Sequence, residues 1–405
     1  MIESRGGRRV VITGVGVVAP CGIGAEAFWA GLAVPPEPNV LRRVRDFDPE
    51  QAGLRRVDAR RMDRFAQFAI VAGGEALADA GLIPDATATG GLTDVDGERV
   101  GVLIGSGIGG ALSWENQAMV LRDKGARSVS PLTVPMVMPN AASAAISMRW
   151  SLFGPCETIA TSCATGTHAV ANAARWVAAG RCDIALAGGA EACLTDTNVA
   201  GFTNMRALSS SGISRPFDVD RDGFCAAEGA AVLVLEDADR AAARGARVYA
   251  EIAGAASTAD GYHITAPAPE GRGAMACMRL ALANAGLDAS DITHINAHGT
   301  STPLNDATEA AVIAKLFGSA GVRPPVSAIK GVTGHSLGAA GAIEAVALAL
   351  TYAKRQLPPT KGTTTVDPEC DIDLVLEPRD WEPGPAISNS FGFGGLNGTL
   401  CFIPA

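Results

Sequence analysis

Cys163 is the residue of this 405-residue sequence whose type and setting point most directly to chemistry. Residues 158–161 are β-branched or apolar and predict a short buried strand, and residues 164–179 predict a helix that Gly180 ends. A cysteine at that corner lies at a helix N-terminus, where unpaired N–H groups and the dipole favour an anion. We expect the thiol pKa to fall from about 8.5 to roughly 3.5–7.5, giving a thiolate nucleophile. The alternative is a buried structural cysteine.

Two histidines and a lysine stand in comparable settings later in the chain. His298 ends the apolar run 292–298 and precedes a Gly-Thr-Ser-Thr-Pro turn. Lys330 and His335 flank Gly-Val-Thr-Gly, just after the predicted strand 326–329. Sites in α/β proteins form at the carboxyl ends of strands, so both groups are candidates for one site. A lone histidine there would more often be a satisfied core residue, but this combination indicates shared chemistry.

Other motifs resemble sites without completing them. The glycine-rich segments 14–19 and 105–110 lack the acidic residue about twenty positions later that a dinucleotide site needs, so close packing explains them better. Residues 334–338 match the G-x-S-x-G nucleophile elbow, but no histidine follows His335 to serve Ser336. His294 and His298 share a strand-like run without a carboxylate ligand pattern, so we expect no metal site.

The elements that position these residues recur in the same order twice. Strands are expected at 10–13 and from 248, helices ending in Ala-Gly-Leu at 80–82 and 285–287, and strands at 100–106 and 292–298. The Cys163 helix is then matched by the helix 339–354 after His335. Chance similarity is the alternative in an alanine-rich chain. Alternating elements predict an α/β fold with mostly parallel sheets, duplicated as halves 1–245 and 246–405, whose equivalent turns could bring Cys163 to face His335.

Composition narrows the class of protein. Apolar residues make up 48% of the chain and charged residues 19%, as in a globular protein. The net charge of −9 argues against nucleic acid as a partner, and no run of about 18 uninterrupted apolar residues suggests a membrane span. The N-terminus has no signal-peptide core. Nine scattered cysteines without a C-x-x-C pair fit reduced thiols in the cytoplasm.

Four segments together give a specific resemblance. They are Thr-Ser-Cys-Ala-Thr-Gly at 161–166, Asn-Ala-His-Gly-Thr-Ser-Thr-Pro at 296–303, Lys-Gly-Val-Thr-Gly-His-Ser-Leu-Gly-Ala-Ala-Gly at 330–341, and Asn-Ser-Phe-Gly-Phe-Gly-Gly-Leu-Asn-Gly at 389–398. Over essentially its whole length the chain resembles the β-ketoacyl-[acyl-carrier-protein] synthases, in the elongating synthase I/II group that includes type II polyketide ketosynthases. The resemblance implies the thiolase fold, with two βαβαβαββ halves in a five-layer αβαβα sandwich, and a dimer.

The resemblance implies decarboxylative Claisen condensation. Cys163 would take an acyl chain from acyl carrier protein as a thioester, and malonyl carrier protein would lose CO2 and attack that thioester. Neutral His298 and His335 would donate N–H groups to the enolate oxygen, while the backbone N–H groups of Cys163 and Phe393 would form the oxyanion hole. Lys330 would organise the site through Glu344. Phe393 would also gate the entry of malonyl.

The resemblance also implies binding residues and partners. The acyl pocket would include Ile108, and further substrate contacts would come from Thr300, Thr302 and Phe391. The carrier protein brings its own phosphopantetheine arm, so no other cofactor is expected. An acidic carrier needs a basic patch, which the resemblance places at Arg60, Arg61 and Arg64; a solvated helix start is the alternative interpretation of these arginines.

Departures from the family pattern leave some questions open. Residues 32–39 replace the family's Gly-x-Ser-Gly-Ile stretch, so the contacts of the loop 32–45 are in doubt. The intact Cys163 argues against a chain-length factor, and His335 argues against the priming synthases, which have Asn there. Cys401 lies within a predicted strand, which argues against a thiolase. A homodimer, a heterodimer with a chain-length factor, and a non-catalytic carrier-binding homologue remain as alternatives.

Overall fold

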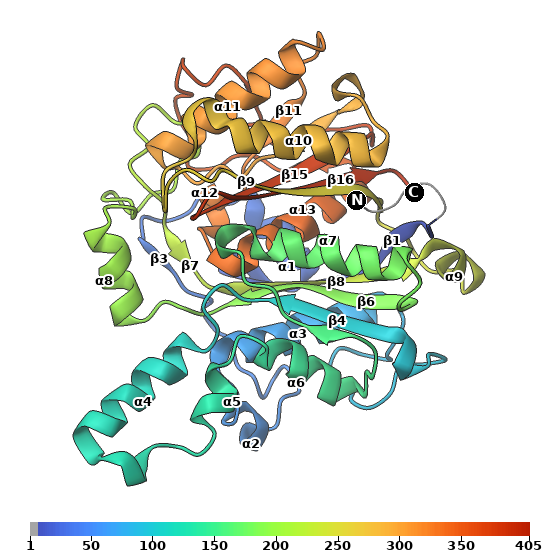
Figure 1. Ribbon diagram of the computed structural model, residues 1–405, viewed down its shortest axis with the longest axis vertical. Helices are drawn as coiled ribbons and strands as arrows, with labels where there is room; N and C mark the ends of the chain where they lie inside the picture. The colour runs from blue at the N-terminus through green and yellow to red at the C-terminus, as the bar shows by residue number, and fades with distance from the viewer. Residues whose placement is uncertain (1–6) are drawn as a thin grey trace.

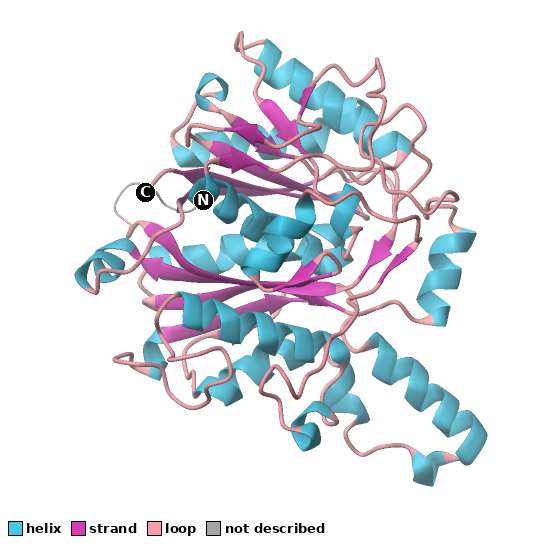
Figure 2. Cartoon of the chain, turned by 180° about the vertical axis from the view of Figure 1, so that it is seen from behind, coloured by secondary structure: helices cyan, strands magenta, loops and turns pink. Residues whose placement is uncertain are grey.

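Two similar sheets enclose a central layer of helices in the computed structural model, which describes residues 7–405 (Figure 1). One outer layer contains α3 (Arg64–Asp79) and α6 (Ala141–Trp150), and the other contains α10 (Arg272–Ala285) and α11 (Pro303–Gly318). Between the sheets lie α7 (Thr165–Ala178) and α13 (Ala340–Lys354). Seen from behind, the same five layers alternate helix and sheet (Figure 2). The predicted thiolase-type αβαβα sandwich is therefore confirmed.

The two sheets repeat one pattern of neighbours. The first runs β5 (Cys156–Glu157), β4 (Val100–Gly105), β6 (Ile184–Glu191), β8 (Gly229–Asp237), β1 (Val10–Ala19). The second runs β11 (Pro325–Ser327), β10 (His294–Asn296), β15 (Ala386–Gly392), β16 (Leu396–Ile403), β9 (Glu251–Ala259). In each, two parallel pairings are followed by two antiparallel ones. The predicted duplication is therefore present in the fold.

Shorter elements complete the chain. The sheets meet where β1 pairs with β9 at Val11 and Glu251, and β13 (Asp373–Leu374) extends the second sheet beyond β11. The remaining strands are β2 (Gly22–Ile23), β3 (Leu41–Arg42), β7 (Ala226–Ala227), β12 (Gln356–Leu357) and β14 (Arg379–Asp380). The remaining α-helices are α1 (Ala25–Leu32), α2 (Arg56–Ala59), α4 (Ala111–Lys124), α5 (Thr133–Val137), α8 (Asp196–Asn204), α9 (Ala238–Ala243) and α12 (Lys330–Thr333).

Burial on both faces explains the apolar composition of the central elements. Every residue of β1, β6 and β8 is buried, as expected for strands covered by helices on both sides. The segment Leu337–Lys354 is long and apolar enough to cross a membrane by composition, but 89% of it lies inside the protein. It therefore has the burial of a core helix.

Glycines let the two central helices approach each other closely. A Cβ atom on Gly166 of α7 would lie 2.5 Å from the backbone nitrogen of Ala342 in α13. A Cβ atom on Gly341 would lie 2.2 Å from the hydroxyl oxygen of Thr167. Real carbon contacts are longer than this, so these two positions require glycine. The corners that begin α7 and α13 are thereby held against each other.

Three local predictions differ from the structure. Residues 158–161 are not a strand; β5 ends at Glu157, and the chain leaves the sheet there to reach the corner of Cys163. The strands predicted at 292–298 and 326–329 are shorter in the structure, where β10 and β11 have three residues each. The loop 32–45, whose contacts the sequence left in doubt, contains β3, which pairs with β7, and the buried side chain of Val44. The proposed boundary between residues 245 and 246 lies between α9 and β9 and stays a proposal.

Candidate active site

A tight corner delivers Cys163 to the centre of the molecule. The 3₁₀ turn Ser162–Ala164 precedes α7, and Ser162 adopts a left-handed φ of 50°. Non-glycine residues seldom adopt that conformation, so the surrounding structure must hold this corner in place. The Thr165 hydroxyl accepts a hydrogen bond from the Thr161 backbone N–H at 2.7 Å. His168 contacts the Thr161 hydroxyl at 2.8 Å and closes the corner from the helix side.

The resting Cys163 thiol is not the low-pKa thiolate that its helix position predicts. Burial raises the pKa of the Cys163 thiol to about 11, against an ordinary value of 9.0. The Phe393 backbone N–H, the Lys330 charge and the Cys163 backbone N–H each lower the pKa, but together they do not offset the burial. The side chain is only 4% exposed. The expectation of a depressed pKa was wrong, and Cys163 has to lose its proton during the reaction.

His298 and His335 converge on Cys163 from the second half of the chain. His298 follows β10, and His335 follows α12, where its backbone N–H donates to the Cys225 carbonyl at 2.8 Å. The thiol sulfur and one ring nitrogen from each histidine all lie within 4.8 Å of one another. The two imidazole rings are 5.5 Å apart and nearly perpendicular. The structure therefore brings together the nucleophile and two candidate donors predicted from sequence.

Both histidines are neutral in this environment. Burial, and then the nearby Lys330 charge, place the pKa of His298 and of His335 well below the ordinary value of 6.5. A neutral imidazole carries one N–H and one acceptor nitrogen. Each ring can thus donate one hydrogen bond without adding a full positive charge to the site, which suits the stabilisation of a developing oxyanion.

Lys330 fixes which nitrogen of His298 carries the proton. The Lys330 ammonium nitrogen lies 3.2 Å from His298 Nδ1, donates to the His298 carbonyl at 2.6 Å, and forms an ion pair with Glu344. An ammonium group can only donate, so Nδ1 accepts and Nε2 bears the hydrogen. Burial raises the pKa of Glu344 to about 7, although Lys330 lowers it. The predicted link between Lys330 and Glu344 is therefore present as a buried contact.

Backbone N–H groups surround the thiol on its other side. The N–H of Phe393 and that of Cys163 both stabilise negative charge on the sulfur. Phe393 follows β15 in a turn that contains Gly394 and Gly395. A Cβ atom at Gly392 would lie 3.0 Å from the Cys163 nitrogen, so the loop backbone packs directly on the corner. These two N–H groups are the pair expected for an oxyanion hole; that role and the gating role of Phe393 stay predictions.

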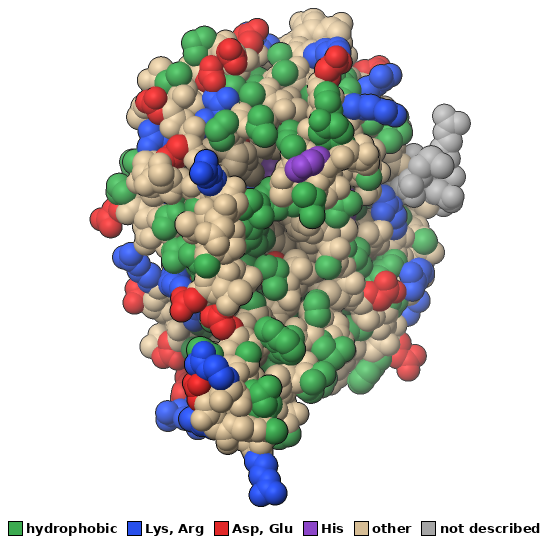
Figure 3. All heavy atoms as spheres, turned by 60° about the vertical axis from the view of Figure 1, so that its left-hand side comes forward, with side chains coloured by type: hydrophobic (Ala, Val, Ile, Leu, Met, Phe, Trp, Pro, Cys, Tyr) green, Lys and Arg blue, Asp and Glu red, His purple; other side chains and the backbone are tan. Residues whose placement is uncertain are grey.

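A cavity of about 350 Å³ connects this centre to the surface. Besides Cys163 and both histidines, its walls include four residues predicted to contact substrate or gate its entry: Thr300, Thr302, Phe391 and Phe393. The Thr300 and Thr302 hydroxyls lie 2.8 Å apart. Figure 3 shows a hollow near the middle of one face of the molecule, with hydrophobic side chains around it. Most of the surface that lines the cavity is apolar.

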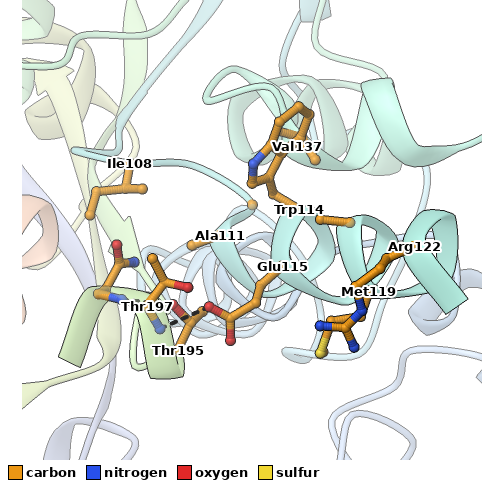
Figure 4. A pocket seen from close by; sticks show the side chains of 12 residues that line it. Ile108, Ala111, Trp114, Glu115, Met119, Arg122, Val137, Thr195 and Thr197 are labelled. Carbon is orange, nitrogen blue, oxygen red and sulfur yellow. Dashed lines mark hydrogen bonds between the residues drawn. The ribbon is translucent and has the colours of Figure 1, made fainter. Parts of the chain in front are cut away.

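Ile108 lies in a second, neighbouring cavity rather than in the one that contains Cys163. It follows β4 in the loop 106–110, is 40% exposed, and faces α4 and α8. Figure 4 shows Ile108 at one end of this cavity, with Trp114 and Thr195 further along it. The predicted role of Ile108 in an acyl pocket therefore requires that the acyl chain pass from the first cavity into the second.

The three predicted carrier-binding arginines are not equivalent. Arg60 and Arg61 are exposed before the start of α3. Arg64 instead donates to the buried Glu228 at 2.9 Å, and its guanidinium lies 4.6 Å from the centre of the Phe68 ring. This ion pair restrains Arg64 more than its two neighbours, and its predicted carrier-binding role stays a prediction. A carrier-binding role for Arg60 and Arg61 stays a prediction.

Two buried acids near the site were missed in the sequence. Glu309 accepts hydrogen bonds from the backbone N–H groups of His298 and Gly299, each at 2.8 Å. Asp306 accepts from the N–H groups of Thr300 and Ser301, each at 3.0 Å. Both acids belong to α11, right after the His298 turn. Their spacing of three, with both side chains facing the preceding turn, was the available signal.

Cys163, His298 and His335 also form the one cluster among residues 7–405 whose donor atoms are close enough to hold a metal ion. Sulfur and imidazole donors would suit zinc. The Phe393 N–H instead directs a hydrogen-bond donor toward the sulfur, and Lys330 directs one toward Nδ1 of His298. The expectation of no metal stays a prediction.

The duplicated sandwich and its Cys-His-His centre define a thiolase-fold condensing enzyme. The sequence model of "Beta-ketoacyl synthase, N-terminal domain" matches residues 7–241, and that of "Beta-ketoacyl synthase, C-terminal domain" matches residues 249–364. The chain belongs to the β-ketoacyl synthase family, and it is an acyltransferase of the synthase II type.

Similar proteins cover nearly the full length of the chain. The 3-oxoacyl-[acyl-carrier-protein] synthase 2 of Synechocystis sp. is 42% identical, and that of Staphylococcus aureus 43%, each over 98% of both chains. Among solved structures, a ketosynthase/chain length factor for ishigamide has a TM-score of 0.88 at 32% identity. A type II polyketide ketosynthase solved with its acyl carrier protein has a TM-score of 0.87 at 31% identity. Both similarities cover 98% of this chain and 100% of the other.

Proposed function

We propose that this enzyme extends an acyl chain by two carbons, using acyl and malonyl groups delivered by acyl carrier protein. The acyl group moves from the carrier thioester to the sulfur of Cys163, and the carrier arm leaves as a thiol. Malonyl carrier protein then loses CO2, and its carbanion displaces Cys163 from the acyl carbonyl. The products are 3-oxoacyl carrier protein, CO2 and the Cys163 thiolate, which takes up a proton from solvent to restore the thiol.

The convergence of Cys163, His298 and His335 within 4.8 Å is the observation that carries this proposal. In the acyl-transfer step, the carbonyl oxygen becomes negative and the N–H groups of Cys163 and Phe393 receive it. The thiol proton leaves with the displaced arm. Because burial raises the thiol pKa to about 11, the resting sulfur enters this step with its proton.

In the decarboxylation step, negative charge develops on the malonyl thioester oxygen. The Nε2–H of His298 and the N–H of His335 would donate to that oxygen while the bond to the departing carboxylate breaks. Neutral rings suit this role because the enolate would take a proton from an imidazolium. Lys330 contributes by keeping Nδ1 of His298 as an acceptor, and Glu344 balances the Lys330 charge in the buried site.

The proposed partner is an acyl carrier protein, whose phosphopantetheine arm would enter through the cavity beside Thr300 and Thr302. A similar ketosynthase was solved in complex with its own acyl carrier protein. The exposed Arg60 and Arg61 would contact the acidic carrier. No further cofactor is proposed. All nine cysteines are free thiols, which supports a reducing compartment such as the cytoplasm.

A second subunit is also proposed. Within residues 7–405 no strand pairs with the outer side of the edge strand β5, and exposed apolar side chains lie on α4, α5 and α6 and just after α5 and α6. They are Trp114, Val134, Met138, Met148 and Phe153. The cavity at Ile108 lies beside α4, and Trp114 lines it (Figure 4). A second copy of this chain is the proposed occupant, and a chain-length factor, as in the ishigamide relative, is the alternative.

Intact-protein mass tests the proposal directly. The purified chain and a Cys163→Ala variant are incubated with carrier proteins loaded with acyl chains of increasing length. An acyl mass increase on the wild type alone supports the proposal, and the preferred length indicates the pathway. Failure of every length, both for the isolated chain and for chain mixed with a chain-length factor, would support the non-catalytic alternative. Sedimentation of the isolated chain then distinguishes a homodimer from a monomer that awaits a different subunit.

A further inference from the structure

Glu191 is a buried carboxylate that the proposed mechanism does not use. It ends β6, its side chain is fully buried, and the largest influences on its charge are burial and hydrogen bonds rather than a cation. Burying a carboxylate without a cation is costly unless several hydrogen bonds compensate. The position therefore requires an explanation from its hydrogen-bond partners.

Four donors converge on the two oxygens of Glu191. Oε2 accepts from the backbone N–H of Gly107 at 2.7 Å and from that of Gly338 at 3.1 Å. Oε1 accepts from the Ser106 hydroxyl at 3.0 Å and from the Ile108 N–H at 3.3 Å. These four donors match the roughly four lone-pair sites of a carboxylate, while burial raises the pKa of Glu191 to about 7.

The two loops that Glu191 joins belong to the two cavities described above. Ser106, Gly107 and Ile108 form the loop after β4, and Ile108 lines the cavity beside α4. Gly338 lies in the turn that follows His335, next to Leu337, which lines the cavity of Cys163. Glu191 therefore connects the wall of one cavity to the wall of the other.

Glycine at both contact points makes this bridge possible. A Cβ atom on Gly107 would lie 2.8 Å from Glu191 Oε2, and one on Gly338 would lie 2.6 Å from the same atom. The Gly338 Cβ would also lie 2.5 Å from the Gly107 nitrogen. The chain after β6 continues the connection, because Cys193 packs against Cys163 and Leu337.

We propose that Glu191 is a positioning residue that holds the loop of Ile108 against the turn of Leu337, and thereby sets how readily long acyl chains reach Cys163. A chain that extends from Cys163 past Leu337 toward Ile108 would have to run along the junction that Glu191 closes. The inference rests on the proposed acylation of Cys163. It assigns to Glu191 no direct contact with substrate.

A Glu191→Gln variant separates this role from simple packing, because glutamine has nearly the same shape. If the NH2 group of the new glutamine takes the place of Oε2, that NH2 group faces two further donors, the N–H groups of Gly107 and Gly338. If it replaces Oε1, the Ser106 hydroxyl can turn to accept, but the Ile108 N–H loses its acceptor. Either orientation loosens the loop of Ile108. Loss of a charge-assisted hydrogen bond corresponds to roughly a tenfold to hundredfold effect.

The experiment compares half-reactions in the full-length enzyme. Rates of Cys163 acylation are measured by intact mass with a short and a long acyl carrier protein, and CO2 release is measured with malonyl carrier protein. The matched control is Glu236→Gln, another fully buried glutamate, which pairs with Arg244 and Thr13 far from the site. Thermal melting of both variants monitors general destabilisation.

The expected result is a roughly tenfold or larger change in the ratio of long-chain to short-chain acylation for Glu191→Gln. Its CO2 release should stay within about threefold of the wild type, and Glu236→Gln should keep the wild-type ratio. An unchanged ratio in a folded Glu191→Gln protein would overturn the role of Glu191 while leaving acylation of Cys163 intact. A wild type that is never acylated would instead overturn the proposed function. If Glu191→Gln fails to fold, Glu191→Asp, which keeps the charge on a shorter side chain, is measured in its place and judged by the same ratio.

Discussion

The corner that begins α7 and the corner that begins α13 share one backbone design but carry different chemistry. Each is a 3₁₀ turn that leads into a buried helix, at 162–164 and at 337–339. Each starts with a non-glycine residue at left-handed φ, 50° at Ser162 and 45° at Leu337. In this alignment Cys163 corresponds to Gly338, and Gly166 corresponds to Gly341.

The difference shows that the unusual corner belongs to the scaffold and not to the nucleophile. A strained φ at Ser162 would by itself suggest a device for catalysis. The same φ at Leu337, where the next residue has no side chain, indicates that the fold imposes it in both halves. The first corner uses the following position to present a thiol. The second leaves that position empty, and Glu191 fills the space beside it.

The largest expected effect comes from making the two corners alike. A Cys163→Gly variant should lose acylation completely, so that condensation falls by about a thousandfold or more. It should keep decarboxylating malonyl carrier protein, since His298 and His335 remain. Intact mass and CO2 release provide the two measurements. Residual acylation at another cysteine would contradict the assignment of the nucleophile.

The second prediction distinguishes the role of His335, beside the α13 corner, from the role of the Cys163 thiol at the α7 corner. His335→Ala should lower malonyl decarboxylation by about 10²–10³, which is typical of losing one oxyanion donor. Acylation of Cys163 should change less than about tenfold, because its oxyanion would be held by backbone N–H groups. Equal losses in the two half-reactions would mean that His335 also serves acyl transfer.

The third prediction concerns the pKa of the thiol that the α7 corner presents. Below its pKa, a thiol reacts through a thiolate fraction that rises tenfold per pH unit. The pKa of Cys163 is raised to about 11 by burial, so alkylation by iodoacetamide should rise about a hundredfold from pH 7 to 9 and continue to rise above pH 9. Peptide mass spectrometry follows Cys163 alone. A plateau below pH 8 would indicate the depressed pKa that the helix position suggested.

The smallest expected effect is on stability at the α13 corner. Gly338→Ala introduces a Cβ 2.5 Å from the Gly107 nitrogen, which should destabilise the protein by about 1–3 kcal/mol. The melting temperature should fall accordingly. Gly201→Ala is the control, because its Cβ in α8 would meet nothing within 4 Å. There, alanine should be neutral or stabilising by up to about 1 kcal/mol. A neutral Gly338→Ala would show that the junction with Gly107 is easily rearranged.

Much of the fold could be predicted because apolar runs, helical spacing and glycine turns indicate the order of strands and helices from nearby residues alone. The paired landmarks at 100–106 and 292–298 correctly matched β4 with β10, and the two corners were correctly matched. The pKa of Cys163 could not be predicted, because a helix N-terminus can be recognised in sequence but the depth of its burial cannot. The ion pair of Arg64 could not be predicted for a similar reason, since its partner Glu228 lies 164 residues away.

The paired glycines between α7 and α13 have a consequence for how the chain folds. Gly166 in α7 and Gly341 in α13 allow the two helices to pack closer together than side chains at these positions would permit. Each helix therefore completes the interior of the other half, and each half by itself lacks part of its core. Neither half can then complete a core alone. Despite its duplicated design, the chain should unfold in a single cooperative transition, and a fragment containing either half should remain unstructured until the other is supplied.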